Sequence, residues 1–104
     1  MKWYNNLYVG KKALKKKHKI IMRAIRRKPQ IGIYMLTLPV NEANALEIYP
    51  SYVLLQKYYR KKKLTVVGIS QGYDEALEVM QDILMDCYNE TGQFLVRHMV
   101  ERHQ

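Results

Sequence analysis

The chain has 104 residues, of which 48% are hydrophobic and 26% charged, and its 18 Lys and Arg exceed its 9 Asp and Glu for a formal net charge of +9. This length and composition predict one folded domain over residues 1–104 and exclude an intrinsically disordered chain. The single cysteine excludes an internal disulfide and a cysteine-based zinc cluster within one chain.

Residues 1–28 are expected to form a short lead-in and one basic helix. Residues 1–10 are aromatic and polar, and we expect a docking arm or an irregular segment there. In residues 11–28 an apolar stripe recurs at spacings of four, three and four residues, the period of an amphipathic α-helix that Pro29 ends. The stripe consists of Leu14, His18, Ile21 and Ile25, and Ile20 and Ala24 widen it, so His18 is expected to be half-buried.

The middle of the chain is expected to combine a buried strand with two short helices. Residues 31–38 are apolar on both faces, which predicts a central strand covered on both sides. Asn41 is a plausible N-cap for a short helix that runs through Tyr49 and ends at Pro50. Residues 51–62 have leucines and tyrosines at helical spacing, and we favour a helix there over an edge strand.

The last forty residues contain the clearest helix. Residues 64–69 predict a second buried strand, and a Ser-Gln-Gly turn leads into a helix over 73–90 that Gly92 should end in the left-handed conformation. Residues 93–100 predict a third strand. The apolar face expected for the helix consists of Tyr73, Leu77, Met80, Ile83, Leu84, Cys87 and Tyr88.

These elements predict an α/β fold with the order helix, strand, one or two helices, strand, helix, strand. The strand-helix-strand unit from residue 64 to residue 100 is expected to be a right-handed crossover. We therefore expect a three-stranded, mainly parallel sheet covered by helices, with an α+β arrangement as the alternative. This architecture serves many functions and indicates none of them by itself.

Charge is divided unevenly along the chain. Residues 1–63 carry sixteen Lys or Arg and two acids, for a net charge of +14, whereas residues 64–104 carry two Lys or Arg and seven acids, for −5. Basic surfaces bind phosphates through counterion release, and neighbouring tyrosines stack on unpaired bases. The alternative is a solvated helix face with the tyrosines in the core. The candidate nucleic-acid-binding residues are Lys15, Lys16, Lys19, Arg23, Arg26, Arg27, Tyr59, Arg60, Lys61, Lys62 and Lys63.

An acidic stripe follows the helix at 73–90. Its members recur every four residues, so their like charges repel slightly along the outer face. The basic helix at 11–28 or the basic half of a second molecule could compensate this charge, and a plain solvated face is the alternative. The stripe consists of Asp74, Glu78, Asp82, Asp86 and Glu90.

Two further features of the sequence do not indicate a function. Gly68 and Gly72 flank a strand-to-helix turn of the kind that binds phosphate in other folds, but Asp74 and Glu75 would repel an anion there. Cys87 falls on the apolar face of its helix and is expected to be an inert thiol. We therefore assign no catalytic residue, no metal site and no cofactor.

The sequence thus predicts a non-enzymatic binding module that makes weak, sequence-independent contact with a polyanion. Nucleic acid is the favoured partner, and an acidic protein is the other candidate. The alternative is a protein-interaction or self-associating module, which the complementary halves and Trp3, Tyr4 and Tyr8 suggest. No apolar run approaches the ~18 residues of a membrane span, and the first residues lack the apolar segment of a signal peptide. We therefore expect a cytoplasmic protein without membrane contact.

Overall fold

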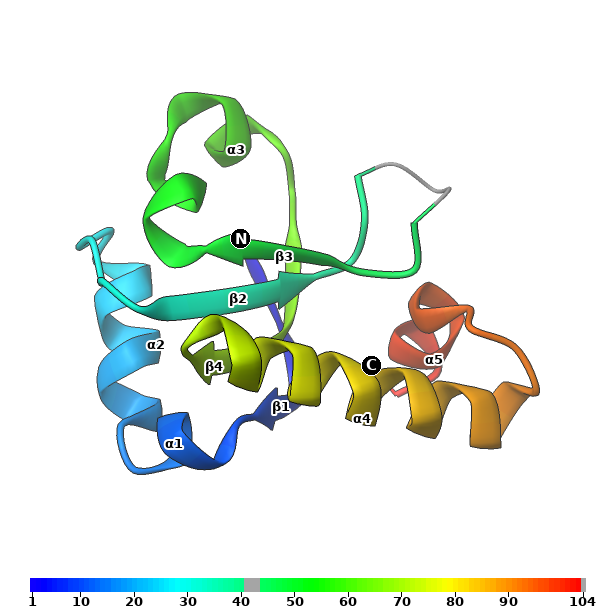
Figure 1. The fold of residues 1–104 in the computed structure, drawn as a ribbon. Coiled ribbons are helices and arrows are strands. Elements are labelled where there is room, and N and C mark those ends of the chain that lie inside the picture. The colour runs from blue at the N-terminus through cyan, green and yellow to red at the C-terminus, as the bar shows by residue number, and fades with distance from the viewer. Residues whose placement is uncertain (41–43, 104) are drawn as a thin grey trace.

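The computed structural model describes residues 1–40 and 44–103, and a four-stranded mixed sheet lies at its centre (Figure 1). The strand order is β1-β4-β2-β3, with β1 parallel to β4 and β2 antiparallel to both of its neighbours. The three-stranded, mainly parallel sheet expected from the sequence is therefore wrong in strand number and direction. The strands are β1 (Lys2–Val9), β2 (Ile33–Thr37), β3 (Glu47–Pro50) and β4 (Thr65–Gln71).

Helices cover both faces of this sheet, so the domain has three layers (Figure 1). Met35 and Ile69 of the central strands pack under the helices of one face, and Leu36 and Val67 pack under those of the other. A small domain of helices around a sheet, the coarser expectation from the sequence, is confirmed. The first face carries α1 (Lys11–Leu14), α2 (Lys17–Ile25), the 3₁₀-helix η1 (Ser51–Leu55) and α3 (Lys57–Lys61), and the second carries α4 (Tyr73–Thr91) and α5 (Val96–Arg102).

The first ten residues contain a strand rather than an arm or an irregular lead-in. β1 pairs with β4 at both of its ends, through Trp3 opposite Val66 and Tyr8 opposite Gly68, and the register shifts between these points. Tyr4 is only 4% exposed and belongs to the core under α4. A strand with such an irregularity lacks strict alternation of apolar residues, which is why the sequence pattern does not reveal it.

The basic segment at 11–28 forms two short helices instead of one. The chain leaves the helical conformation at Lys16 (φ −114°, ψ 16°), within a run of lysines whose like charges repel. The buried residues are Ala13 and Ile20, whereas Leu14 is 60% exposed and His18 is exposed as well. Of the expected stripe, Ile20 is therefore buried as predicted, whereas Leu14, His18 and Ile25 face solvent.

The segment between Pro39 and residue 62 contains a strand that the sequence does not predict. Glu47–Pro50 pairs with Tyr34–Thr37 as the edge strand β3, where the sequence predicts the end of a helix. An edge strand tolerates the missing N–H of its proline. Asn41, the expected N-cap, lies outside the described residues. Residues 51–62 are helical as expected, in the two short helices η1 and α3, and the edge-strand alternative is wrong.

The long helix α4 agrees closely with its expected bounds. Gly92 follows it with φ of 75°, which is the predicted left-handed end. Of the expected apolar face, Ile83 and Cys87 are buried, whereas Tyr73 and Tyr88 are exposed. The helix turns Ala76 and Val79 toward the sheet as well, where Val79 fills the space that the missing side chain of Gly68 leaves.

The segment 93–100, expected to be a strand, begins α5 instead. Val96, Met99 and Val100 follow the helical pattern i, i+3, i+4, and each is at most 2% exposed in the core beneath α4. Over so few residues an apolar pattern fits both a helix and a strand, and packing decides between them. The right-handed crossover predicted from residue 64 to residue 100 is therefore wrong too.

One buried carboxylate joins the two helical layers at the edge of the sheet. Because β1 and β4 are parallel neighbours, α1 and α4 begin at the same edge before they cover opposite faces. The Glu75 carboxylate accepts backbone N–H bonds from Lys12 (2.7 Å), Ala13 (3.2 Å) and Gln71 (2.9 Å). A Cβ on Gly10, the N-cap of α1, would lie 2.0 Å from the Glu75 Oε1 atom. Glu75 therefore caps α1 from another helix, and only glycine fits beside it.

Replacing Glu75 by glutamine should lower the free energy of unfolding by about 3 kcal/mol, because an amide NH₂ would face N–H donors that now share a charged acceptor. Urea unfolding followed by circular dichroism measures the change. Glu78→Gln on the same helix is the matched control, since Glu78 is exposed and its loss should cost less than about 0.5 kcal/mol. Equal stability of the two variants would contradict the capping role of Glu75.

Candidate nucleic-acid interface

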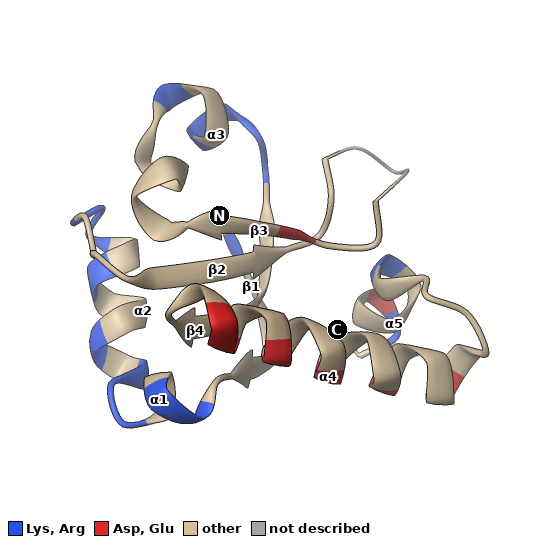
Figure 2. Ribbon diagram, in the orientation of Figure 1, with Lys and Arg blue, Asp and Glu red and all other residues tan. Residues whose placement is uncertain are grey.

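The sheet separates the basic and the acidic parts of the domain (Figure 2). Residues 11–28 carry ten Lys or Arg and residues 57–63 carry five, with no acid in either segment. Both segments lie on the face that holds α1, α2, η1 and α3, and we call these four helices with their connections the basic layer. α4, which covers the opposite face, carries six acids and no Lys or Arg, and one of these acids, Glu75, is buried at the start of α1. The basic segment therefore does not lie against the acidic stripe.

No Lys or Arg of the basic layer forms an ion pair with a described residue. Among residues 1–40 and 44–103, the only salt bridges join Glu90 to Arg102 (3.7 Å) and to the imidazole of His103 (2.9 Å), and none involves the basic layer. The acidic stripe is exposed along its whole length. Asp86 accepts a hydrogen bond from the Tyr8 hydroxyl, and burial together with this bond raises the pKa of Tyr8 above its ordinary value. The cations of the basic layer thus keep their charge for a partner.

All eleven residues predicted to bind nucleic acid lie in the basic layer. Nine of them are exposed, and Tyr59 and Lys62 are half-buried. The end of α2 lies next to α3 within the layer. Lys15, Lys16 and Lys19 lie near the beginning of α2, away from this junction. The turn before α2 holds Lys15 and Lys16, α2 and its end hold Lys19, Arg23, Arg26 and Arg27, and α3 and its end hold Tyr59, Arg60, Lys61, Lys62 and Lys63.

Four of the predicted residues surround one pocket at that junction. Arg27, Tyr59, Arg60 and Lys62 line a cavity of about 190 Å³ between the end of α2, α3 and the start of β1, and Trp3 lines it with them. No acid occurs among the described residues around this cavity, which we call the Trp3 pocket. Its remaining walls are apolar and consist of Met1, Ala24, Ile25, Leu54, Leu55 and Leu64.

Trp3 is the pocket residue that sequence reasoning does not assign to this site. The sequence suggests for it a role in self-association beside Tyr4 and Tyr8. The pairing of β1 with β4 instead turns Trp3 toward the core under the basic layer and Tyr4 toward the opposite core. Because this depends on a strand that pairs far along the chain, no local signal predicts it.

The ring of Tyr59 is held in place by two other tyrosines. Its centroid lies 5.1 Å from that of Tyr49 and 5.0 Å from that of Tyr58, and both pairs meet edge to face. The Nζ atom of Lys62 lies 5.1 Å from the centroid of Tyr58, which is 60% exposed and not part of the core. These contacts fix the aromatic wall of the Trp3 pocket before any ligand binds.

The backbone at Arg27 adopts a left-handed conformation that glycine usually occupies at the end of a helix. The end of α2 is a Schellman motif, in which the N–H of Arg27 donates to the carbonyl of Ala24 (3.1 Å) and the N–H of Lys28 donates to that of Arg23 (2.9 Å). The left-handed residue of this motif is Arg27, with φ of 59°. A residue with a Cβ pays about 1 kcal/mol for this conformation relative to glycine. Arg27 lines the Trp3 pocket despite that cost.

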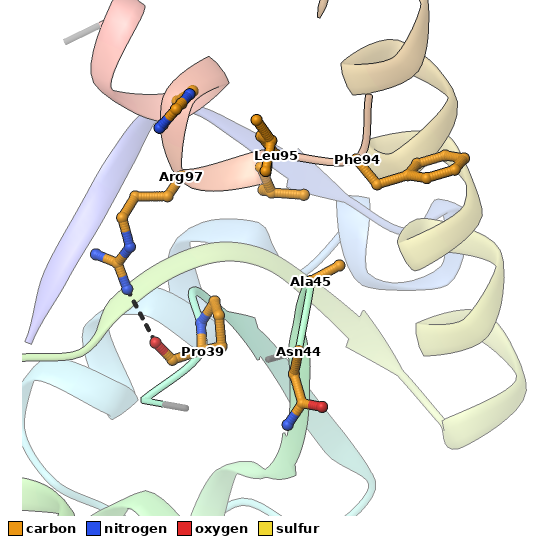
Figure 3. Close-up of a pocket in the computed structure, with 8 residues that line it drawn as sticks. Pro39, Asn44, Ala45, Phe94, Leu95 and Arg97 are labelled. Atoms are coloured by element: carbon orange, nitrogen blue, oxygen red, sulfur yellow. Dashed lines mark hydrogen bonds between the residues drawn. The ribbon is translucent and has the colours of Figure 1, made fainter. Parts of the chain in front are cut away.

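A larger hollow lies outside the predicted residues. It measures about 480 Å³ and lies between the loop after β2 and the beginning of α5 (Figure 3). The Nη2 atom of Arg97 donates a hydrogen bond to the carbonyl of Pro39 (2.9 Å) across it, while Phe94 and Leu95 are half-exposed. The described residues of this hollow include one Arg and one His but no acid and no nucleophile, so it offers neither a basic cluster nor a catalytic set.

The turn after β4 and the thiol of Cys87, which the sequence offers as a phosphate site and a reactive group, are both inaccessible. The Glu75 carboxylate fills the strand-to-helix turn after β4, so that turn has no room for a phosphate. Cys87 is fully buried, and burial raises the pKa of its thiol, which keeps it protonated and unreactive.

The described residues contain no group of three His, Cys, Asp or Glu that could hold a metal ion. None of the helices in the described ranges is long and apolar enough to cross a membrane.

Comparisons with known proteins assign no family: no protein-family model, no curated protein and no solved structure matches this chain. The candidate interface therefore rests on charge and geometry.

The unpaired charges of the two outer layers should make the protein more stable as salt is added. Like charges four residues apart repel by roughly 0.2–0.5 kcal/mol each, and raising the ionic strength to about 0.15 M shortens the screening length to about 8 Å, which weakens this repulsion and removes most of that between more distant charges. We expect the free energy of unfolding to rise by about 1 kcal/mol between low salt and that value. Urea titrations at several NaCl concentrations measure it, and a decrease with salt would contradict the observed separation of charge.

Proposed function

We propose that the basic layer binds the phosphate backbone of nucleic acid weakly and without sequence preference. The observation that carries this proposal is the lack of any ion pair between the basic layer and the acids among the described residues. The sheet keeps the acidic stripe on the opposite face, so the field of the basic layer is not cancelled at its own surface. The protein would act as a binding module rather than as an enzyme.

The composition of the layer supports contact with the backbone rather than with base edges. Most of its cations are lysines, whose point charges suit phosphate but lack the planar fork with which arginine reads guanine. Contacts of this kind bind by counterion release, with dissociation constants on the order of 10⁻⁴–10⁻⁶ M at physiological salt. We expect affinities of that order for DNA and RNA of any sequence.

Binding should depend steeply on salt and on individual residues of the basic layer. If about five cations meet phosphates of a duplex, the logarithm of the association constant should fall against the logarithm of salt with a slope near −4 to −5. Arg23→Ala on α2 should reduce the magnitude of this slope by about 1. Fluorescence anisotropy of a labelled duplex measures both quantities.

Arg102→Ala on α5 is the matched control, because it removes the same charge from the opposite face of the sheet, where Arg102 pairs with Glu90. It should leave affinity and slope unchanged. Lack of binding at low ionic strength, or equal effects of the two substitutions, would remove the proposal.

A second candidate function is association of the protein with itself. The acidic stripe and the basic layer lie on opposite faces, so the stripe of one copy could dock on the basic layer of the next. Such a contact joins two different surfaces and extends head to tail unless it closes into a ring. It would compete with nucleic acid for the same cations.

Light scattering at low salt distinguishes this second candidate from the first. Asp82 is exposed near the middle of the acidic stripe, and Asp82→Lys should abolish association while leaving nucleic-acid binding intact. A protein that remains monomeric at high concentration and low salt, with or without the substitution, would eliminate self-association.

A further inference from the structure

The Trp3 pocket combines two features that suit an anionic ligand with an aromatic ring. Trp3 and Tyr59 provide aromatic walls, and Arg27, Arg60 and Lys62 provide positive charge at the same cavity. No acid among the described lining residues offsets this charge. Aromatic walls beside cations are the arrangement that stacks nucleobases while the backbone follows the positive surface.

The size of the pocket limits what it can hold. Its volume of about 190 Å³ lies below the roughly 300–1,000 Å³ of pockets that enclose drug-sized molecules and cofactors. It therefore has room for one ring system rather than for a whole dinucleotide. The rest of the ligand has to lie outside, over the basic layer.

The strained backbone at Arg27 indicates that this side chain serves a purpose other than folding. Glycine at the same position would relieve the left-handed conformation, and Arg27 makes no ion pair with a described residue that would offset the strain. Because Arg27 lines the same pocket as Trp3 and Tyr59, its side chain is available to a phosphate next to any base that enters the cavity.

We infer that the basic layer prefers single-stranded over double-stranded nucleic acid, because one unpaired base enters the Trp3 pocket while Arg27 holds the adjoining phosphate. This inference rests on the proposed function and adds the class of substrate. A duplex would have to unpair and extrude a base before it could use the pocket, which costs binding energy that a single strand does not spend.

Trp3 is the only tryptophan of the chain, so its fluorescence reports on the pocket directly. Titration with single-stranded oligothymidylate should quench this emission, because the base stacks on or beside the indole. Inorganic polyphosphate of equal charge should bind to the same layer without quenching, since it has no base. A duplex of equal length should bind about tenfold more weakly than the single strand once salt is matched.

Arg27→Gly separates the binding role of this residue from its effect on folding. It should raise Tm by roughly 4–8 °C through relief of strain, and it should weaken oligothymidylate binding about tenfold. Lys19→Ala is the matched control, because Lys19 is an exposed cation of the same helix outside the pocket. Both variants should weaken polyphosphate binding equally and slightly, whereas only Arg27→Gly should selectively weaken oligothymidylate binding.

The outcomes distinguish the inference from the proposed function. Quenching by oligothymidylate with a selective loss in Arg27→Gly supports both. Equal binding of oligothymidylate, duplex and polyphosphate without quenching overturns the pocket and leaves the basic layer as a backbone binder. Lack of binding by all three at low salt overturns the proposed function as well. A more stable Arg27→Gly protein with unchanged oligothymidylate affinity overturns the role of Arg27.

Discussion

The three N–H bonds that the Glu75 carboxylate accepts hold the two helical layers to one edge of the sheet. Parallel neighbours β1 and β4 send α1 and α4 to opposite faces, and in open α/β sheets the crevice at such a place commonly receives a ligand. Here the protein supplies its own anion, and Gly10 keeps the space for it. This junction is therefore structural, and ligand binding has to be sought elsewhere on the molecule.

The same topology decides how the charge of the chain is distributed in space. α1 and α2 lie on one face of the sheet and α4 lies on the other. The sheet therefore separates the ten Lys and Arg of residues 11–28 from the acidic stripe. An arrangement with both helices on one face would have paired these charges and left little field for a partner. The separation gives the protein one basic and one acidic surface, and the junction of α2, α3 and β1 adds the aromatic Trp3 pocket to the basic one.

The parts of the fold that follow from the sequence are those with a strong local pattern. Continuous apolar runs predict the central strands β2 and β4, and the helical period with Gly92 predicts α4. The edge strands β1 and β3 follow only from pairing with distant segments, and α5 is decided by packing on the core under α4. The cations that the sequence proposes for an interface all lie in the basic layer, because their two segments are each local in sequence. The sequence does not reveal that Trp3 joins them or that Arg27 takes a left-handed conformation, because both depend on tertiary structure.

The claim that the basic layer and its Trp3 pocket form the binding surface is tested most directly by nuclear magnetic resonance. Titration of ¹⁵N-labelled protein with a single-stranded oligonucleotide at low salt should shift the indole N–H of Trp3 and the amides around Arg27, Arg60 and Lys62. The amides along the exposed face of α4 should stay unchanged, because the sheet and the basic layer lie between them and the ligand. Shifts concentrated on α4 or α5, or the lack of any shift, would contradict the account.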